Sequence, residues 1–329
     1  MLIVNPHATS TTPLRRDVIA RALASELDLT VVQTRYRGHA AQFAGEAARD
    51  RCELVLTLGG DGTVNEAVNG LLRAVPPADS GPETRPALAT VPGGSANVFT
   101  RALGMPSDPV DATGRILAAL TGGGRRTIGV GLAEERYFTV NAGLGFDAEV
   151  VRAIEGLRAD GQEASAGLYV WTAIRHFYGV TNRRQPALVL ELDGRPAARR
   201  LFFAIVSNAS PWTYLGSRPI NPSPEAGFDT GLDVFALRSL GTLPTLLTLR
   251  HMLGLGPVRP VRPVGPVMPG GRTGPEGSAD SKHILSLHDE RELTFRAIRP
   301  IAFQVDGEYV GEREHVTFRA VPDALRVIS

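Results

Sequence analysis

The stretch GGDGTVNE at residues 59–66 constrains this chain more than any other, because it directly follows the apolar run CELVLTL at residues 52–58. Such an apolar run is typical of a buried β-strand. Glycines at its end let the backbone turn sharply and let a ligand approach the amide groups closely. A helical spacing of apolar residues comes next, at Val64, Ala67, Val68, Leu71 and Leu72. A strand, a glycine loop and a helix in this order predict a phosphate-binding loop.

The start of the expected helix carries the pattern of a capping box. Thr63 is a residue type that accepts hydrogen bonds from helix amides, and Glu66 stands three residues later. We therefore expect Thr63 to cap this helix and Glu66 to complete the box. The positive end of the helix would then point at the contents of the loop.

Strand-like and helix-like segments alternate through the first third of the chain. Short β-prone segments lie at residues 2–4, 29–34 and 54–58, and helix-forming segments lie at 15–27 and 40–50. Right-handed crossovers turn this order into a parallel sheet with helices on both faces, and ligands bind beyond the carboxyl ends of such strands.

A second glycine loop has the same setting as the first. VPGGSANVF at residues 91–99 follows another short strand, LATV at residues 88–91. Two such loops on neighbouring strands are expected to enclose one nucleotide.

Composition limits the classes of protein that need considering. A length of 329 residues favours two domains over one, and a formal net charge of +1 indicates no global attraction to nucleic acid. Lys282 is the only lysine, which excludes a P-loop lysine anywhere else in the chain. Cys52 is the only cysteine, which excludes an intramolecular disulfide and fits a reducing compartment.

The N-terminus and the hydropathy bear on location. Met1 to Val4 run straight into NPHAT without the charged and long apolar regions of a secretory signal. No window approaches the roughly 20 apolar residues that a spanning helix needs. We expect a cytoplasmic protein that at most rests on the inner face of the membrane.

From about residue 127 the pattern becomes mostly strand-like. Expected strands lie at residues 137–143, 187–194, 199–208, 232–238, 292–298, 301–310 and 315–321. This predicts a mostly antiparallel β domain. Helices are expected at 168–178 and 243–253, and the proline- and glycine-dense segment at about 254–283 is expected to be an insertion without a core.

Motifs spread along the chain resemble those of bacterial diacylglycerol kinases and related lipid kinases, including the sphingosine kinase catalytic domain. They are NPHAT at residues 5–9, GGDGTVNE, PGGSANVFTRALG at 92–104, NAGLGFDAEV at 141–150 and QVDGEYVG at 304–311. NAD kinases and phosphofructokinases carry loops similar to GGDGT, so the resemblance depends on all of the motifs occurring in the family's order.

The resemblance implies an N-terminal α/β nucleotide-binding domain with a parallel sheet and a C-terminal β-sandwich, with the active site in the cleft between the domains. The domain bounds are then 1–126 and 127–321, with residues 322–329 returning to the first domain.

The resemblance also implies which residues bind ATP. These are the first loop, the residue after the second strand, the two glycine loops and the start of the helix: Asn5, Pro6, His7, Ala8, Thr9, Thr34, Gly59, Gly60, Asp61, Gly62, Thr63, Val64, Asn65 and Ser95.

The DGE segment is expected to supply the catalytic base. Phosphoryl transfer needs a held γ-phosphate, compensated charge and a group that takes the proton of the attacking hydroxyl. Asp306 or Glu308 suits the last task, and the sequence does not say which of them performs it. Asp61 is assigned to Mg²⁺ or to a water network around it, because a carboxylate repels phosphate. On turn statistics alone, Asp306-Gly307 would be an ordinary hairpin turn.

Two positions depart from the family's pattern. Val98 follows Asn97 where many relatives have aspartate, and Thr230 precedes Gly231 where many have a metal-associated aspartate. The resemblance places the metal at Gly227, Thr230 and Leu232, with Asp229 or Asp233 as the substitute carboxylate. Elsewhere, Asp147 and Glu149 are expected to face solvent or to cap a helix, with a role in the metal network as the alternative.

We predict an ATP- and Mg²⁺-dependent kinase that phosphorylates a hydroxyl of diacylglycerol or a similar lipid at the membrane surface. An NAD kinase-like enzyme and a nucleotide-binding regulatory protein without turnover are the alternatives. The segment at residues 168–184 mixes aromatic residues with arginines, which suits either an anionic membrane interface or a helix packed on the β domain. The sequence leaves open whether the protein forms a homodimer.

Overall fold

The computed structural model describes residues 1–9, 12–159, 172, 175, 185–241, 245, 250, 252 and 283–329. The chain divides into two compact units. The first comprises Met1–Val140, Phe228–Thr230 and Val321–Ser329, and the second comprises Asn141–Gly227 and Gly231–Ala320. The sequence-based domain boundary at residues 126–127 stays a prediction; the compact units divide after Val140.

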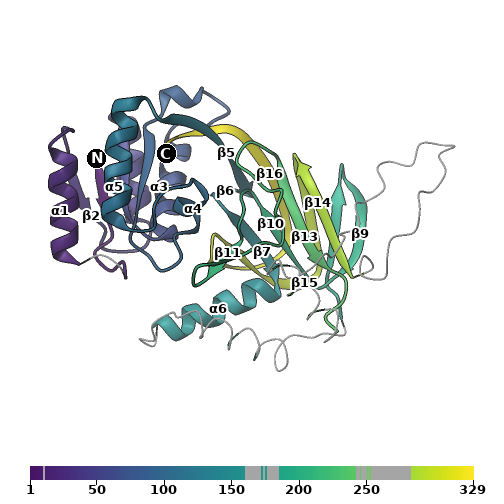
Figure 1. The fold of residues 1–329 in the computed structure, drawn as a ribbon. Helices are drawn as coiled ribbons and strands as arrows, with labels where there is room; N and C mark the ends of the chain where they lie inside the picture. The colour runs from purple at the N-terminus through teal and green to yellow at the C-terminus, as the bar shows by residue number, and fades with distance from the viewer. Residues whose placement is uncertain are drawn as a thin grey trace. The chain divides into compact units, whose positions relative to one another are not determined.

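The first unit alternates strands and helices (Figure 1). In chain order its elements are β1 (Leu2–Val4), α1 (Pro13–Ala24), β2 (Val31–Gln33), α2 (His39–Arg49), β3 (Leu54–Gly59), α3 (Asp61–Ala74), a 3₁₀ turn (Pro82–Thr84), β4 (Ala87–Pro92), α4 (Val98–Ala102), α5 (Pro109–Gly122), β5 (Arg125–Ala133) and β6 (Arg136–Phe138).

The strands of this unit form the predicted parallel sheet. Their order is β2-β1-β3-β4, every neighbouring pair is parallel, and the end of β16 (Glu308–Ile328) adds a further parallel pairing of Val327 with Leu88. β2 lies on one side of β1 and β3 lies on its other side. The connection from β1 to β2 and the connection from β2 to β3 therefore run across the sheet in opposite directions, and right-handed crossovers put α1 and α2 on opposite faces. In agreement, α1 packs against α5 and α2 packs against α3.

The predicted capping box is wrong, because α3 begins earlier than its apolar spacing indicates. Its N-cap is Gly60, without a side-chain hydrogen bond, so Thr63 lies inside the helix. Glu66 caps a different helix: its carboxylate accepts hydrogen bonds from the amides of Gly38 (2.7 Å) and Ala40 (3.1 Å) at the start of α2. Gly38, the N-cap of α2, has no side chain to do this.

Replacing Glu66 by alanine is therefore expected to destabilise the first unit through α2. The loss should be about 1–2 kcal/mol, the usual cost of removing an N-terminal cap. Urea unfolding of Glu66→Ala measures it, with Glu66→Gln as the control because the amide oxygen still accepts one of the hydrogen bonds. An alanine variant as stable as the wild type would show that these amides are satisfied by water.

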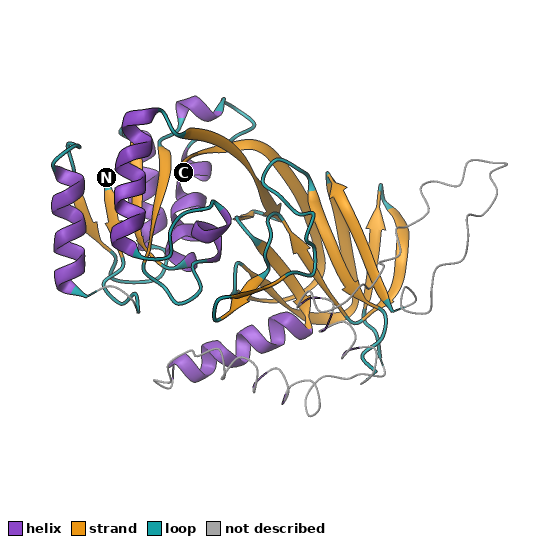
Figure 2. Ribbon diagram, viewed as in Figure 1, coloured by secondary structure: helices purple, strands orange, loops and turns teal. Residues whose placement is uncertain are grey.

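The second unit is rich in antiparallel strands, and α6 is the helix among its described elements (Figure 2). Its elements are β7 (Asn141–Gly145), α6 (Phe146–Ala159), β8 (Leu188–Leu192), β9 (Arg195–Leu201), β10 (Phe203–Ser207), β11 (Thr213–Leu215), β12 (Arg218–Ile220), β13 (Leu232–Leu237), β14 (Ile284–Glu290), β15 (Glu292–Val305) and the first part of β16. The neighbours run β14-β13-β10-β7-β15-β16, and each of these pairs is antiparallel. The predicted combination of a parallel α/β part and an antiparallel part is confirmed.

Several strand bounds differ from the prediction. The strand expected at 137–143 is split into β6 and β7, and the one at 199–208 is split at Phe202. β15 contains the whole strand expected at 292–298 and the first half of the one expected at 301–310, which is interrupted by a turn at residues 306–307. β16 contains the end of that expected strand and the whole of the one expected at 315–321. An alternation of apolar and polar residues does not reveal where a strand is interrupted, because the residues of a short turn can continue the same alternation.

Three further expectations fall almost wholly outside the described residues. These are the helices at 168–178 and 243–253 and the insertion at 254–283. Among the described helices, none combines the length and the apolar character needed to cross a membrane.

Candidate functional site

The GGDGT loop joins β3 to α3, as predicted, but its glycines serve a different purpose from the one expected. Gly60 is extended, with φ of −91°, and neither Gly59 nor Gly62 is among the residues with positive φ. The space around Gly59 and Gly60 explains why these positions are glycine. A Cβ on Gly59 would lie 2.5 Å from the Thr63 hydroxyl oxygen, and one on Gly60 would lie 3.2 Å from the Gly94 Cα. Glycine is needed at positions 59 and 60 because other parts of the chain come close, whereas a Cβ on Gly62 would meet no atom within 4 Å.

The second glycine loop packs directly on the first. The Gly93 amide donates to the Gly59 carbonyl over 2.8 Å, and a Cβ on Gly94 would lie 2.7 Å from the Gly60 Cα. Asn97 holds the second loop in shape, since its side chain accepts from the Gly94 amide (2.9 Å) and donates to the Gly94 carbonyl (2.8 Å). The structure thus brings the two predicted loops into contact, with Ser95 exposed beside them.

Asp61 links the two loops through its side chain. Its Oδ1 accepts a hydrogen bond from the Phe99 amide (3.1 Å), an N-terminal amide of α4. The α4 N-cap, Asn97, makes no side-chain cap of its own. Asp61 is half-buried at the first position of α3, so it has a structural task in addition to any metal task.

The predicted first loop lies at the same edge of the sheet. Asn5 follows β1 and Thr34 follows β2, as Gly59 ends β3, and parallel strands place such positions side by side. The Asn5 side chain accepts from the His7 amide (3.0 Å) and donates to the Thr63 hydroxyl (3.3 Å). The first loop is therefore tied to the phosphate-binding loop of the prediction.

Two predicted contacts have side chains engaged elsewhere. Asn65 is 1% exposed; its amide donates to the Tyr137 carbonyl (2.9 Å) and accepts from Arg136 (3.0 Å). Val64 is 2% exposed and belongs to the core. If either residue touches a ligand, its backbone makes the contact.

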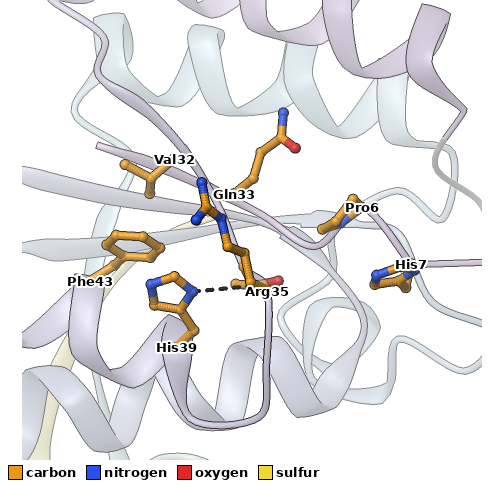
Figure 3. A pocket seen from close by; sticks show the side chains of 8 residues that line it. Pro6, His7, Val32, Gln33, Arg35, His39 and Phe43 are labelled. Atoms are coloured by element: carbon orange, nitrogen blue, oxygen red, sulfur yellow. Dashed lines mark hydrogen bonds between the residues drawn. The ribbon is translucent and has the colours of Figure 1, made fainter.

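A pocket of about 730 Å³ opens at this edge (Figure 3). Its lining includes the predicted residues Pro6, His7 and Thr34 and adds Val32, Gln33, Arg35, His39 and Phe43. The rings of His39 and Phe43 stack with centroids 4.1 Å apart, and the Arg35 amide lies 3.2 Å from His39 Nδ1. Sequence reasoning missed this aromatic pair, although its spacing of four residues at the start of a helix was a usable signal.

The DGE segment is a two-residue hairpin turn between β15 and β16. Val305 pairs with Glu308, and Asp306 and Gly307 have φ of 47° and 77°, as Asp-Gly hairpin turns do. Unlike a simple turn, it is anchored to β7. The Asp306 carboxylate accepts from the Asn141 amide (3.0 Å), and the Asp306 amide donates to the Asn141 carbonyl (2.8 Å).

The expectation that Asp147 faces solvent is wrong, and the alternative that it caps a helix stays a prediction. Its side chain is 6% exposed, and Oδ2 accepts from Gln304 Nε2 over 2.7 Å. Burial raises the pKa of Asp147 to about 6, against the lowering effect of the hydrogen bond from Gln304. Glu149, in the same helical turn, is half-exposed.

The raised pKa of Asp147 predicts a pH dependence of stability. The folded state binds this proton more tightly than the unfolded state, so the stabilisation is complete below pH 4 and is lost as the pH rises through about 6. Between pH 4 and 7.5 the wild type should lose about 2–3 kcal/mol relative to Asp147→Asn. Urea unfolding of both proteins at both pH values measures the difference. A difference independent of pH would place the titration elsewhere.

The predicted metal residues have mixed environments. Leu232 is fully buried, Asp229 is exposed, and Thr230 is half-exposed. Asp233 is an unsuitable substitute ligand, because it is 2% exposed and its Oδ1 is within hydrogen-bond distance of His288 Nδ1 (2.8 Å) and of the Asp289 amide (3.2 Å). Among the described residues, no group of three or more His, Cys, Asp or Glu side chains has the arrangement of a metal site.

Comparison with known proteins finds a family match in the first part of the chain. Residues 1–131 match the family model of the diacylglycerol kinase catalytic domain. The diacylglycerol kinase of Bacillus subtilis is 40% identical over 110 residues, which are 33% of this chain and 32% of that protein. A Chromohalobacter salexigens protein named a probable lipid kinase, YegS-like, is 36% identical over 141 residues, which are 43% of this chain and 42% of that protein. The matches thus span less than half of these relatives.

Solved structures extend the likeness of fold to nearly the whole chain. A structure described as a diacylglycerol kinase from Bacillus anthracis covers 99% of this chain and 95% of its own, with a TM-score of 0.67 and 19% identity. Another B. anthracis structure, with the same coverage, has a TM-score of 0.72 and 23% identity. At these identities the likeness concerns the fold alone.

Proposed function

We propose, from the match of residues 1–131 to the diacylglycerol kinase catalytic domain family model, that this protein is an ATP- and Mg²⁺-dependent lipid kinase. It transfers the γ-phosphate of ATP to a hydroxyl of diacylglycerol or a similar lipid. The observation that carries the proposal is the contact between the two glycine loops, at Gly60 and Gly94, within the segment that matches the family.

The nucleotide part of the proposal rests on the first unit. Gly60 and Gly94 approach so closely that side chains are excluded, which leaves backbone amides as the groups that a phosphate meets. The start of α3 adds a positive helix end. The neighbouring pocket offers the stacked rings of His39 and Phe43, a surface suited to a purine (Figure 3).

The metal part of the proposal rests on two candidate carboxylates. Asp61 is the carboxylate within the glycine loops, and oxygen ligands of this kind suit Mg²⁺ bound mainly through substrate phosphates. Mg²⁺ supplies compensation of the phosphate charge. Asp229 is the remaining candidate near Thr230, since Asp233 is committed to His288 and Asp289.

The chemical step needs a proton acceptor. Asp306 or Glu308 takes the proton of the lipid hydroxyl while its oxygen bonds to the γ-phosphorus. The bond from that phosphorus to the bridging oxygen breaks, and ADP leaves. The two hydrogen bonds that anchor the half-buried Asp306 on Asn141 support a role for this turn beyond reversing the chain. Because the acceptor lipid resides in a bilayer, the enzyme would act at a membrane surface.

One assay tests the proposal and both alternatives. The purified protein is incubated with γ-labelled ATP and Mg²⁺ in separate arms with diacylglycerol micelles, sphingosine micelles, NAD and no acceptor, and each arm is repeated with EDTA. We expect labelled phosphatidic acid that disappears with EDTA. Label on NAD would establish the NAD kinase-like alternative, and ATP binding without any labelled product would establish the regulatory one.

A further inference from the structure

A buried polar chain connects α6 to the DGE turn. Gln304 stands on β15 opposite Gly143 of β7, and Asp147 reaches it from the first turn of α6. Gly143 makes this possible, because a Cβ there would overlap the Asp147 carboxylate and lie 2.8 Å from Gln304 Nε2. The sequence around Asp147 is thus arranged to let a helix side chain pass a strand and meet the next one.

The hydrogen bonds fix the Gln304 amide in one orientation. Its Nε2 donates to Asp147 Oδ2 (2.7 Å) and to Asn141 Oδ1 (3.1 Å), and its Oε1 accepts from the Gly307 amide (2.8 Å). An ionised carboxylate only accepts hydrogen bonds, so Gln304 has to turn its NH₂ group toward Asp147. The amide oxygen then faces Gly307. A rotated amide would place two donors against each other at the turn.

The same unit contains an ordinary turn of the same type for comparison. Asp193 and Gly194 join β8 to β9 with φ of 50° and 70°, close to the values of 47° and 77° at Asp306 and Gly307. Within the described part of the chain, no side-chain hydrogen bond supports the Asp193-Gly194 turn. A two-residue Asp-Gly hairpin therefore forms here without a buried carboxylate behind it.

The buried polar chain that holds the DGE turn costs free energy of folding. Asp147, Gln304 and Asn141 are 6%, 1% and 6% exposed, and burying a carboxylate costs free energy that a surface turn does not need to expend. A buried and fully connected polar network of this kind rigidifies what it holds. The arrangement suits a turn whose side chains have to be kept in one position.

We propose that Asp147 and Gln304 are positioning residues that hold the Asp306–Glu308 turn in place for proton transfer from the acceptor hydroxyl. This inference rests on the proposed kinase function. Asp147 acts through Gln304, and Gln304 acts on the backbone of Gly307, so neither is required to touch the substrate.

Two variants test the proposal. Asp147→Asn keeps the size of the side chain but can also donate, so it no longer fixes the Gln304 amide. Asp147→Ala/Gln304→Met removes the whole polar pair and leaves no unpaired buried charge, and such apolar replacements are often neutral or stabilising. Asp193→Asn is the control, since it also replaces an aspartate by asparagine but does so in the ordinary turn, away from the buried polar chain.

The readouts separate bracing from general stability. We expect amide hydrogen exchange of Gly307 to rise by about tenfold or more in both variants, with exchange of Gly194 unchanged as an internal reference. Lipid-kinase kcat should fall by about tenfold or more, with the Kd for ATP unchanged, because groups near 1 Å out of place lose rate and not nucleotide binding. The double variant should unfold at a similar urea concentration to the wild type and still have the low kcat.

The outcomes distinguish this proposal from the proposed function. Unchanged Gly307 exchange in a folded Asp147→Asn or double variant would overturn the bracing, as would wild-type kcat in the double variant. A wild-type protein that phosphorylates no lipid, but whose variants release the Gly307 amide, would overturn the kinase assignment and leave the bracing established.

Discussion

Asp306→Asn and Glu308→Gln are expected to abolish most lipid phosphorylation while leaving ATP binding intact. Both changes keep the shape and remove the charge that accepts a proton, so the variant that lacks the base should lose on the order of 10²-fold or more in kcat. The structure favours asparagine over alanine at position 306. The asparagine oxygen can still accept from the Asn141 amide, as Asp306 Oδ1 does over 3.0 Å, so the turn keeps its anchor.

Kinase rates and ATP affinities of the two variants, measured side by side, identify the base. Asp193→Asn serves as the control, because it makes the same chemical change at φ of 50° in the other Asp-Gly turn. Near-normal phosphorylation by both variants would refute a catalytic role for the DGE segment. Residues 305–308 would then be a hairpin turn whose anchoring needs another explanation.

The second large effect is expected from Gly94→Val. A Cβ at this position would lie 2.7 Å from the Gly60 Cα, and because both are backbone positions no side-chain rotation relieves the contact. The two glycine loops must separate. A displacement near 1 Å in a binding and reacting geometry costs about 10²-fold in rate, so turnover should fall at least that far and ATP affinity should fall with it. Overpacking should cost about 1–3 kcal/mol of stability.

Gly114→Ala is the matched control for this change. Gly114 lies within α5, and a Cβ there would meet no atom within 4 Å. Alanine in a helix interior should add about 0.5–1 kcal/mol of stability and leave ATP binding unchanged. If Gly94→Val bound ATP as tightly as the wild type, the nucleotide would have to be assigned to a different part of the first unit.

The sequence alone determined those features that depend on local patterns. Apolar runs of strand length and helical spacing identified β1 to β3 and the helices between them, and crossover handedness then required a parallel sheet. The two glycine loops follow neighbouring strands, so they could be recognised as one candidate site, and the resemblance to the kinase family added the first loop to it.

Only the tertiary structure decided which atoms each polar side chain meets. The spacing of Thr63 and Glu66 fits a capping box, yet Glu66 bonds to Gly38 and Ala40, residues of another helix. Such partners are distant in sequence, and a residue pattern records only neighbours along the chain.

The glycine loops and Asp147 show the same limit at the candidate site. Gly60 is explained by Gly94, which approaches it from the next strand, and not by a turn that needs positive φ. Asp147 looked like a surface residue at the start of a helix, and it is buried because Gly143 leaves room for it to reach Gln304. These contacts exist only in the folded chain, because close approach and burial depend on segments that are distant in sequence and that folding brings together.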